Sequence, residues 1–471
     1  MIDLALIREK PDWVKAHIAR RHDETALARI DPLLELDKLR RTLIQQAEAM
    51  QAERKKLNAA IGRFRGNKTL LPGAAGAAAS RAAMLIAARD YSAALDLLSN
   101  PPTTGEGDKE GGLSALSDAL RVMGEAVEGL NSQLEKIDHD LHDHLQWLPN
   151  FLDDAVPEGV TSDDNVIHPA EGTPRTFDFT PKPHWEIGPA LDIIDFERGV
   201  KLSGTRFYIL KGMGARLQRA LLNYFLDFHG GRGFTEFYLP YLVKEDMLYG
   251  AGQFPKFKNE VYTDQDAGLY LLPTAEIGLT NVHRDEVLEA AQLPLRYMAN
   301  TPCWRREATS AGRDVRGIKR VHQFQKVEMY TLCTPEESAA EHERIINAAS
   351  DLCRSLGIPF RKVELCGGDM GFAMSRTIDL EMWAPGCNEW LEVSSCSNAK
   401  AYQARRSALK YRPTPGGKSE YLHTLNGSGL AAPRVIIAIL ENYQQADGSV
   451  VVPDVLRPYL GGLEVIRPEG S

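Results

Sequence analysis

The apolar residues of the first 150 positions recur at the spacing of long helices. One stripe advances by alternating steps of three and four residues without interruption, and it comprises Leu113, Leu116, Leu120, Met123, Val127, Leu130, Leu134, Ile137 and Leu141. A second stripe upstream fades near Ile61, and it comprises Leu36, Leu39, Leu43, Met50 and Leu57. A seam this narrow becomes buried against a partner helix. Two seams in one chain therefore predict a long antiparallel helical hairpin.

The segment between the stripes, about residues 69–111, has a different composition. Its middle, about residues 77–98, is rich in alanine and predicts one or two short helices. The stretch NPPTTGEGDKEGG that follows is rich in turn-forming residues and predicts a flexible connector. This inserted segment interrupts the hairpin but leaves both stripes intact.

The pattern changes after Pro149, and the rest of the chain predicts an α+β domain. The stretch VPEGVTSDDNV is polar, so we expect a linker over residues 151–182 between a helical domain, 1–150, and a second domain, 183–471. In that domain the pattern predicts helices over 210–229 and 335–356, a final helix in PRVIIAILENYQ, and extended segments near 235–239, 295–306 and 320–333.

The bulk composition is that of a soluble globular protein, with 43% hydrophobic and 25% charged residues. The chain has 55 basic and 64 acidic side chains and a net charge of −9, so any site for a polyanion must be local. Its six cysteines form no C-x-x-C pair, which favours reduced thiols in a cytoplasmic protein. The first residues lack the apolar core of a signal peptide, and no apolar run is long enough to span a membrane.

Local charge departs from this balance in three places. Residues 38–68 carry nine basic and two acidic side chains, a net of +7, whereas residues 113–148 carry two basic and seven acidic ones, a net of −5. These charges either pair across the seam or leave a basic surface suited to a phosphate backbone. Residues 302–330 carry seven basic and three acidic side chains, a net of +4, which indicates either a solvated loop or a polyanion site.

Three stretches of the second domain form a set. The first, RLQRALLNYFLDFHGGRGFTEFYLPYLV, predicts an amphipathic helix, a glycine break and a β-rich segment that ends at Pro240. The second, PCWRREATSAGRDVRGIKRVHQFQKVEMY, predicts two extended runs around a polar loop and contains an R-x-E pair. In the third, TLNGSGLAAPRVIIAILENYQ, glycines precede a helix with Arg434 near its start. In this order the set resembles the three signature motifs of class II aminoacyl-tRNA synthetases.

The segments PTAEIGLTN, EVSSCSNAKAYQARR and TLNGSGLAAPR, with the second motif, resemble those of seryl-tRNA synthetases of the bacterial type, and the hairpin resembles that family's tRNA-binding arm. The resemblance covers nearly the whole chain except residues 69–111. It implies an α+β fold, in which an antiparallel-sheet catalytic domain follows a coiled-coil arm, and a homodimer joined through the first motif. The implied tRNA contacts on the arm are Arg54, Lys55, Arg63 and Arg65.

The activity implied by the resemblance has two steps. The carboxylate of L-serine attacks the α-phosphorus of ATP to give seryl-adenylate, and the 3′-terminal adenosine of tRNA(Ser) then accepts the serine. The family also charges tRNA(Sec). Two rival hypotheses are a paralogue that activates an amino acid for a non-tRNA acceptor and a non-catalytic tRNA-binding relative. The first should have lost the arm and the second Arg305, Glu307 or Arg434, but this chain retains all of them.

A guanidinium can hold a phosphate through two parallel hydrogen bonds, which suits arginine to a nucleotide site. The resemblance makes Arg305 and Arg434 catalytic contacts to the α-phosphate from opposite sides. It places Glu307, on the same strand face as Arg305, at the adenine, with Phe324 stacked on the base beside Val321. The implied ATP site comprises Arg305, Arg306, Glu307, Val321, Phe324, Glu392, Val393, Ser394, Ser395 and Arg434. The loop charges Arg313, Arg316, Lys319 and Arg320 face ATP or the tRNA acceptor end, or else are solvated.

Carboxylates in this basic region suit Mg²⁺ bound between phosphates. The resemblance assigns that role to Glu392, accompanied by Ser395. Glu381 lies on a neighbouring stretch and either shares the ion or forms a structural ion pair.

The resemblance assigns the serine contacts to Thr274, Ala275, Glu276, Glu328, Asn426 and Ser428. Thr274 and Glu276 suit the ammonium group, and Glu328 suits the hydroxyl; outside the family context Glu328 would be a buried structural carboxylate. A site that hydrogen-bonds the hydroxyl can reject alanine by roughly 10⁴–10⁵, because its own polar groups would then stay unpaired. Threonine must be excluded by shape.

Overall fold

The computed structural model describes residues 1–308 and 316–468. The chain divides into two units, one formed by Met1–Leu27 with Gln146–Ser471 and the other by Ala28–Leu145. The first of these boundaries differs from the expected helical domain over 1–150. Residues 1–27 contain α1 (Leu4–Glu9), α2 (Pro11–Ala19) and α3 (Glu24–Leu27).

The N-terminal helices belong with the α+β domain because their side chains are satisfied there. The buried guanidinium of Arg21 donates to the main-chain carbonyls of Asn150 at 2.6 Å and Gly371 at 3.1 Å. Arg20 donates to the carboxylate of Glu158 at 2.8 Å. A buried arginine needs several acceptors, and here they lie far along the chain.

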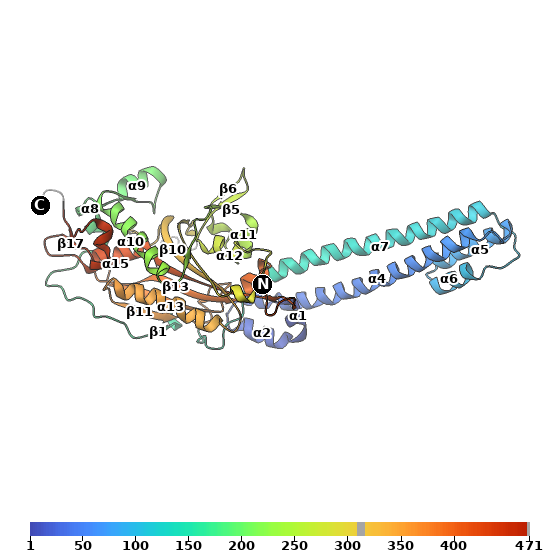
Figure 1. Cartoon of the computed structure of the whole chain (residues 1–471), viewed down its shortest axis with the longest axis horizontal. Helices are drawn as coiled ribbons and strands as arrows, with labels where there is room; N and C mark the ends of the chain where they lie inside the picture. Colours follow the sequence, from blue (N-terminus) through green and yellow to red (C-terminus); the bar gives the residue numbers. More distant parts are fainter. Residues whose placement is uncertain (309–315, 469–471) are drawn as a thin grey trace. The chain divides into compact units, whose positions relative to one another are not determined.

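The unit Ala28–Leu145 is an antiparallel hairpin of α4 (Ile30–Gly66) and α7 (Lys109–Gln146) (Figure 1). Arg40 pairs with Asp138, whereas Arg65 donates to Ser117 at 2.6 Å, so residue numbers run in opposite directions along the two helices. All nine residues of the downstream stripe are buried or half-buried. The predicted hairpin of two long helices is confirmed.

The upstream stripe differs from its prediction at two points. Leu39 is 49% exposed, because the seam position between Leu36 and Leu43 is residue 40, and one residue of offset turns a side chain about 100° around a helix. The stripe also continues past Ile61, since Phe64 is buried in the same core.

The inserted segment forms α5 (Pro72–Ala87) and α6 (Tyr91–Ser99), which pack with α4 and the start of α7 around an alanine-rich core. One or two short helices were predicted over about residues 77–98, and the first observed helix begins earlier, at Pro72. The small residues allow close approach: a Cβ added at Gly112 of α7 would lie 2.5 Å from the carbonyl oxygen of Gly76 in α5. Alanine and glycine in this segment are therefore packing residues.

The other unit is built on an eight-stranded sheet. Its strands, in spatial order, are β1 (Val166–Ile167), β11 (Phe360–Glu364), β12 (Arg376–Ala384), β13 (Glu389–Lys400), β16 (His423–Ala431), β10 (Gln323–Cys333), β9 (Leu295–Trp304) and β4 (Thr235–Glu236). All neighbouring pairs are antiparallel except β4 with β9. Two smaller sheets have two strands each: β2 (Ile194–Asp195) with β3 (Ile209–Leu210), and β17 (Val450–Val451) with β18 (Val465–Ile466). Two others have three strands, in the spatial orders β5 (Leu242–Lys244), β7 (Leu269–Leu271), β6 (Thr263–Asp264) and β15 (Glu420–Tyr421), β14 (Lys410–Arg412), β8 (Val287–Glu289).

Helices cover one face of the large sheet (Figure 1). The helices of this unit that follow the linker are α8 (His184–Ala190), α9 (Phe196–Ser203), α10 (Met213–Gly230), α11 (Glu245–Gly250), α12 (Glu276–Asn281), α13 (Ser338–Ser355), α14 (Tyr402–Arg406) and α15 (Ala432–Asn442). The main core lies between the sheet and α10, α13 and α15. The predicted α+β class, with an antiparallel-sheet domain, is confirmed. In the described residues no helix combines the length and apolarity that a bilayer crossing requires.

Alternation along the central strands separates this core from a polar face. In β10, Val327 and Met329 belong to the core under the helices, whereas Glu328 between them points to the other face. In β16, Gly427 lets α13 approach, because a Cβ there would lie 2.4 Å from Ile345. The flanking side chains, Asn426 and Ser428, face a cavity on the side away from α13.

Candidate active site

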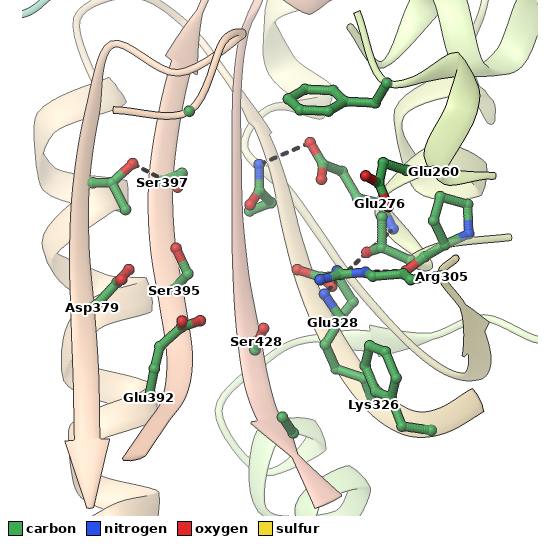
Figure 2. A pocket seen from close by; sticks show the side chains of 18 of the residues that line it. Glu260, Glu276, Arg305, Lys326, Glu328, Asp379, Glu392, Ser395, Ser397 and Ser428 are labelled. Carbon is green, nitrogen blue, oxygen red and sulfur yellow. Dashed lines mark hydrogen bonds and ion pairs between the residues drawn. The ribbon is translucent and has the colours of Figure 1, made fainter. Parts of the chain in front are cut away.

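The polar face of the sheet forms the floor of a cavity of about 570 Å³. Its lining comes from β10, β12, β13 and β16, from the start of α15, and from residues around α12. Figure 2 shows Glu276, Glu328 and Arg305 gathered at one side, and Asp379, Glu392 and Ser395 on the two strands at the other. Predicted residues from three separate segments of the sequence, PTAEIGLTN, the second motif and EVSSCSN, thus line one cavity.

Glu328 lies at the bottom of the cavity and is 1% exposed. Its Oε2 accepts a hydrogen bond from Thr274 Oγ1 at 2.9 Å and is paired with the ammonium of Lys326. Thr274 also accepts from the backbone N–H of Glu276 at 3.2 Å, at the start of α12. These contacts hold Glu328 and Thr274, two predicted serine contacts, in one orientation.

Glu276 is the second buried carboxylate of this group. Its Oε1 accepts hydrogen bonds from Gln403 at 2.6 Å and from Asn426 at 3.1 Å. Burial, and then the charge of Glu328, raise the pKa of Glu276 to about 7, although Lys326 acts in the opposite direction. Two buried carboxylates with a single lysine nearby favour a cationic ligand.

Two residues of this group, Gln403 and Lys326, were not among the predicted contacts. Gln403 is fully buried and uses both sides of its amide: its nitrogen donates to Glu276 and, at 2.9 Å, to the carbonyl of Ala251, and its oxygen accepts from Tyr330 at 3.0 Å and Thr424 at 2.7 Å. Gln403 stands 127 residues from Glu276 in the chain. Nothing in its own neighbourhood in the sequence indicated that contact.

Arg305 and Arg434, the two predicted contacts to the α-phosphate, both line the cavity. Arg305 follows the last residue of β9, donates from Nε to the carbonyl of Pro273 at 3.2 Å, and lies 5.2 Å from the ring centre of Phe324. Arg434, in the first turn of α15, donates to the carbonyl of Glu392 at 2.7 Å and lies 3.3 Å from its carboxylate. The two guanidinium groups reach the same cavity from different elements.

The expectation that a strand continues from Arg305 through Glu307 is wrong. β9 ends at Trp304, and Glu307 has a positive φ of 50°, which no strand residue adopts. Glu307 nevertheless lines the cavity, 3.8 Å from Arg320. The intervening Arg306 points elsewhere, with its guanidinium 5.3 Å from the ring centre of Tyr262, so it is not part of the lining.

Most of the other predicted ligands line the cavity, namely Val321, Phe324, Glu392, Val393, Ser395 and Ser428. Ser394 and Ala275 do not. Ser394 points to the opposite face of β13, where its hydroxyl donates to the carbonyl of Ser428 at 2.6 Å. Ala275 is fully buried in the core beneath α12. Both support the lining without touching the cavity.

Glu381 does not line the cavity, although it lies opposite Glu392 in the strand register. Its carboxylate pairs with Arg361 at 2.6 Å, which favours the structural ion pair over a metal ligand. Asp379, which lies opposite Ser395, faces the cavity instead. Its Oδ1 is buried without a hydrogen-bond partner, and burial followed by the charge of Glu392 raises its pKa.

The loop charges divide into several cases. Arg313 lies outside the described residues. Arg316 is exposed, whereas Lys319 and Arg320 line the cavity, and Lys319 is paired with Glu389. The solvated-loop alternative therefore stays open for Arg316 alone among the described residues of this set.

On the helical hairpin, Lys55, Arg63 and Arg65 are exposed. Arg54 is half-buried against α7: a Cβ added at Gly124 would lie 2.7 Å from its guanidinium, and its Nε is buried without a partner. Arg54 is thus turned toward the partner helix, which does not suit the tRNA contact predicted for it.

Two family models match the chain. A model described as the tRNA synthetase class II core domain (G, H, P, S and T) matches residues 257–443, and one described as the seryl-tRNA synthetase N-terminal domain matches residues 1–98. The chain is 51% identical to a serine–tRNA ligase of Roseiflexus sp. (strain RS-1) over 467 residues, which cover 99% of this chain and all of the relative. It is 49% identical to a serine–tRNA ligase of Roseiflexus castenholzii at the same coverage.

Solved structures agree with these matches. The seryl-tRNA synthetase of Pyrococcus horikoshii, complexed with ATP, superposes with a TM-score of 0.85 at 33% identity, over 99% of this chain and all of that one. The cytoplasmic serine–tRNA ligase of Naegleria fowleri, in complex with AMP, superposes with a TM-score of 0.79 at 26% identity, over all of this chain and 99% of that one.

Proposed function

The chain belongs to the seryl-tRNA synthetase family, and on that premise we propose that it is an ATP-dependent, AMP-forming ligase of L-serine and tRNA. The observation that carries this function is the division of one cavity. Buried Glu276 and Glu328 lie at one side with the guanidinium of Arg305 beside them (Figure 2), and Arg434 lies with Glu392 at the other side. An amino acid and a polyphosphate bound side by side match that distribution of charge.

In the first step the serine carboxylate attacks the α-phosphorus of ATP, and pyrophosphate leaves. Negative charge increases on the α-phosphate oxygens as the new bond forms. Arg305 and Arg434 stabilise this charge from two sides, and because Pro273 and Glu392 hold them in place, little reorganisation is needed. In the second step the terminal adenosine hydroxyl of tRNA attacks the mixed anhydride, and AMP leaves.

Serine is recognised at the buried end. Glu276 pairs with the ammonium group, assisted by Asn426, which already donates to its carboxylate. Glu328 accepts a hydrogen bond from the serine hydroxyl, in addition to those from Thr274 and Lys326. Alanine has no hydroxyl, so the buried carboxylate of Glu328 would lack this hydrogen bond. Binding of alanine is therefore strongly disfavoured.

Mg²⁺ is the metal that fits the oxygen donors at the other end. Asp379, Glu392 and Ser395 would hold it, and Asp379 brings a buried oxygen that lacks a partner. When bound there, it would neutralise charge on the ATP phosphates.

We further propose that the protein is a cytoplasmic homodimer that charges tRNA(Ser) and, where it is present, tRNA(Sec). Exposed Tyr238, at 88%, and Leu242, at 47%, follow the edge strand β4 in the first motif and suit a subunit contact. Lys55, Arg63 and Arg65 provide exposed positive charge on the hairpin for a phosphate backbone.

ATP–pyrophosphate exchange with a panel of amino acids tests the function. We expect serine to support exchange at least about 10³-fold better, in kcat/KM, than alanine or threonine. Exchange driven best by another amino acid would contradict the proposal. Charging of tRNA then separates it from a paralogue with a non-tRNA acceptor, which would exchange with serine but leave tRNA(Ser) uncharged.

A further inference from the structure

A buried polar cluster lies behind the nucleotide end of the cavity, and none of its members lines that cavity. His184, the first residue of α8, and Glu441, near the end of α15, are both fully buried, and Cys387 is half-buried beside them. His184 Nδ1 lies 2.8 Å from Glu441 Oε1, and the thiol of Cys387 donates to the same oxygen at 3.0 Å.

The hydrogen bonds of this cluster assign the protons on His184. Its Nε2 accepts from the backbone N–H of Ile318 at 3.1 Å, so that nitrogen carries no proton. The proton is therefore on Nδ1, which donates to Glu441. Burial lowers the pKa of His184, in agreement with a neutral ring. Burial raises the pKa of Glu441, but the hydrogen bonds from His184 and Cys387 outweigh it and lower the pKa overall.

Side chains of α15 hold two adjacent residues of the chain, Ile318 through His184 and Lys319 directly. Arg434 and Glu441 are seven residues apart on α15, so they lie on one face about two turns apart. Glu441 orients His184, which binds the N–H of Ile318. Arg434 donates from Nε to the carbonyl of the next residue, Lys319, at 3.3 Å. Arg320 and Val321, which line the cavity, follow at once.

The preceding residue shows how closely the loop meets the imidazole. Gly317 has a φ of 73°, and a Cβ at this position would lie 1.9 Å from His184 Nε2. Only glycine permits both this backbone conformation and this approach.

We propose that His184, oriented by Glu441, is a positioning residue for ATP. It fixes the segment Gly317–Lys319 and thereby places Arg320, Val321 and Arg434 around the nucleotide. This inference rests on the proposed function, in that the nucleotide is the substrate of the same cavity. His184 does not touch the reacting atoms; it acts through the N–H of Ile318.

His184, Cys387 and Glu441 would also make a metal-ligand set, since their ligand atoms all lie within 4.8 Å of one another. The hydrogen bonds favour the positioning role, because each of these atoms already has a partner within the protein and Nδ1 is protonated. Burial, reinforced by the carboxylate of Glu441, raises the pKa of the Cys387 thiol. Binding of a zinc ion by these three residues is therefore the alternative that the experiments must exclude.

Two substitutions divide the two functions of the imidazole. In His184→Asn the side-chain amide nitrogen can replace Nδ1–H as the donor to Glu441. The backbone N–H of Ile318 then has no acceptor. The longer Gln in His184→Gln places its amide oxygen where Nε2 was, so the bond from Ile318 is kept. We expect H184N to raise the KM for ATP in pyrophosphate exchange about tenfold, the equivalent of one buried hydrogen bond, with the KM for serine changed less than about twofold. H184Q should recover most of this loss.

Thermal unfolding with and without ATP gives a second readout that needs no amino acid. We expect the ATP-induced increase in Tm to shrink in H184N and to persist in H184Q. Equal ATP affinities in H184N and the unsubstituted protein, or equal losses in both variants, would overturn the inference. So would one tightly bound zinc ion per purified chain. If the amino acid activated is not serine, the proposed function fails, yet the ATP comparison between the two variants still decides this inference.

Discussion

The two ends of the cavity are built differently. At the serine end, Thr274, Glu276 and Glu328 are at most 6% exposed, and side chains hold one another through hydrogen bonds. At the end proposed for the nucleotide, the side chains of Arg434 and Glu392 are 22% and 45% exposed. Arg434 there, and Arg305 beside Glu276 and Glu328, are held largely by main-chain carbonyls. The amino-acid end is formed in advance, whereas the nucleotide end has charges still available to a ligand.

This difference has a physical reason. Discrimination between serine and alanine depends on one hydroxyl, so the group that detects it must be shielded from water that could replace the missing hydrogen bond. ATP offers many charged oxygens, and arginines that remain partly solvated can bind it without the cost of burying an unpaired charge. The predictions below test this contrast, from the largest expected effect to the smallest.

Removing an arginine proposed to bind the α-phosphate should affect chemistry but not folding. For Arg305→Ala we expect the rate of pyrophosphate exchange to fall about 10²–10³-fold, because one preorganised charge is lost from the transition state. The midpoint of thermal unfolding and the dimer should persist, since this side chain is half-exposed. Loss of the dimer together with activity, measured by gel filtration, would make Arg305 a structural residue.

Removing a charge at the serine end should affect both. Glu328→Gln leaves the ammonium of buried Lys326 without its partner, which costs about 3–5 kcal/mol of folding stability. We expect the KM for serine to rise about 100-fold while the KM for ATP changes less than about twofold. Unfolding in urea and exchange kinetics measure the two effects. A stable variant with normal serine affinity would contradict the role assigned to Glu328.

The pKa of Glu276, about 7, predicts a pH dependence for serine. The protonated carboxyl cannot pair with an ammonium group, so kcat/KM for serine should fall, at the limit tenfold per pH unit, as the pH decreases below about 7. The folded-state pKa lies above the unfolded value, so this group favours folding at low pH and loses that contribution as the pH rises through about 7. Glu276→Gln should remove this ionisation from the stability profile. A profile for serine that is level from about pH 5.5 to 8 would contradict the prediction.

Gln403 tests whether the serine end depends on residues that never touch serine. Gln403→Leu removes a donor from Glu276 and leaves the hydroxyls of Tyr330 and Thr424 without their acceptor. Each unpaired buried group costs about 1–3 kcal/mol, so we expect a Tm lower by several degrees and a KM for serine about tenfold higher. The KM for ATP serves as the internal control. An equal increase in both KM values would remove the distinction between the two ends.

The smallest effect is expected for the ion pair of Glu381. Glu381→Gln should change exchange less than about twofold and stability by less than about 1 kcal/mol, because the pair with Arg361 is partly solvated. Asp379→Asn is the matched variant on the same strand, and it should raise the Mg²⁺ concentration needed for half-maximal exchange. The reverse result would return Glu381 to the metal site.

The sequence by itself determined the repeating parts of this protein. The heptad steps from Leu113 to Leu141 required a partner helix, because a narrow apolar seam has no other way to leave water, and the structure supplies α4. The pattern also predicted an extended segment near 320–333, where β10 runs over Gln323–Cys333. Arg305, Glu328 and Arg434 could be predicted as site residues because each stands in a short contiguous motif that resembles one of the family.

Tertiary structure alone decided which side chains meet. Gln403 reaches Glu276 across 127 residues, and Arg21 is satisfied by carbonyls about 130 and 350 residues away, so no local pattern contains either contact. Asp379 lines the cavity, whereas Glu381, two residues further along β12, pairs with Arg361. Arg54 lies against Gly124 of α7. Local patterns determine which element a residue joins and often which face it takes. The neighbours on that face depend on packing between distant segments, and those neighbours here set the burial and the hydrogen bonds of the cavity's carboxylates.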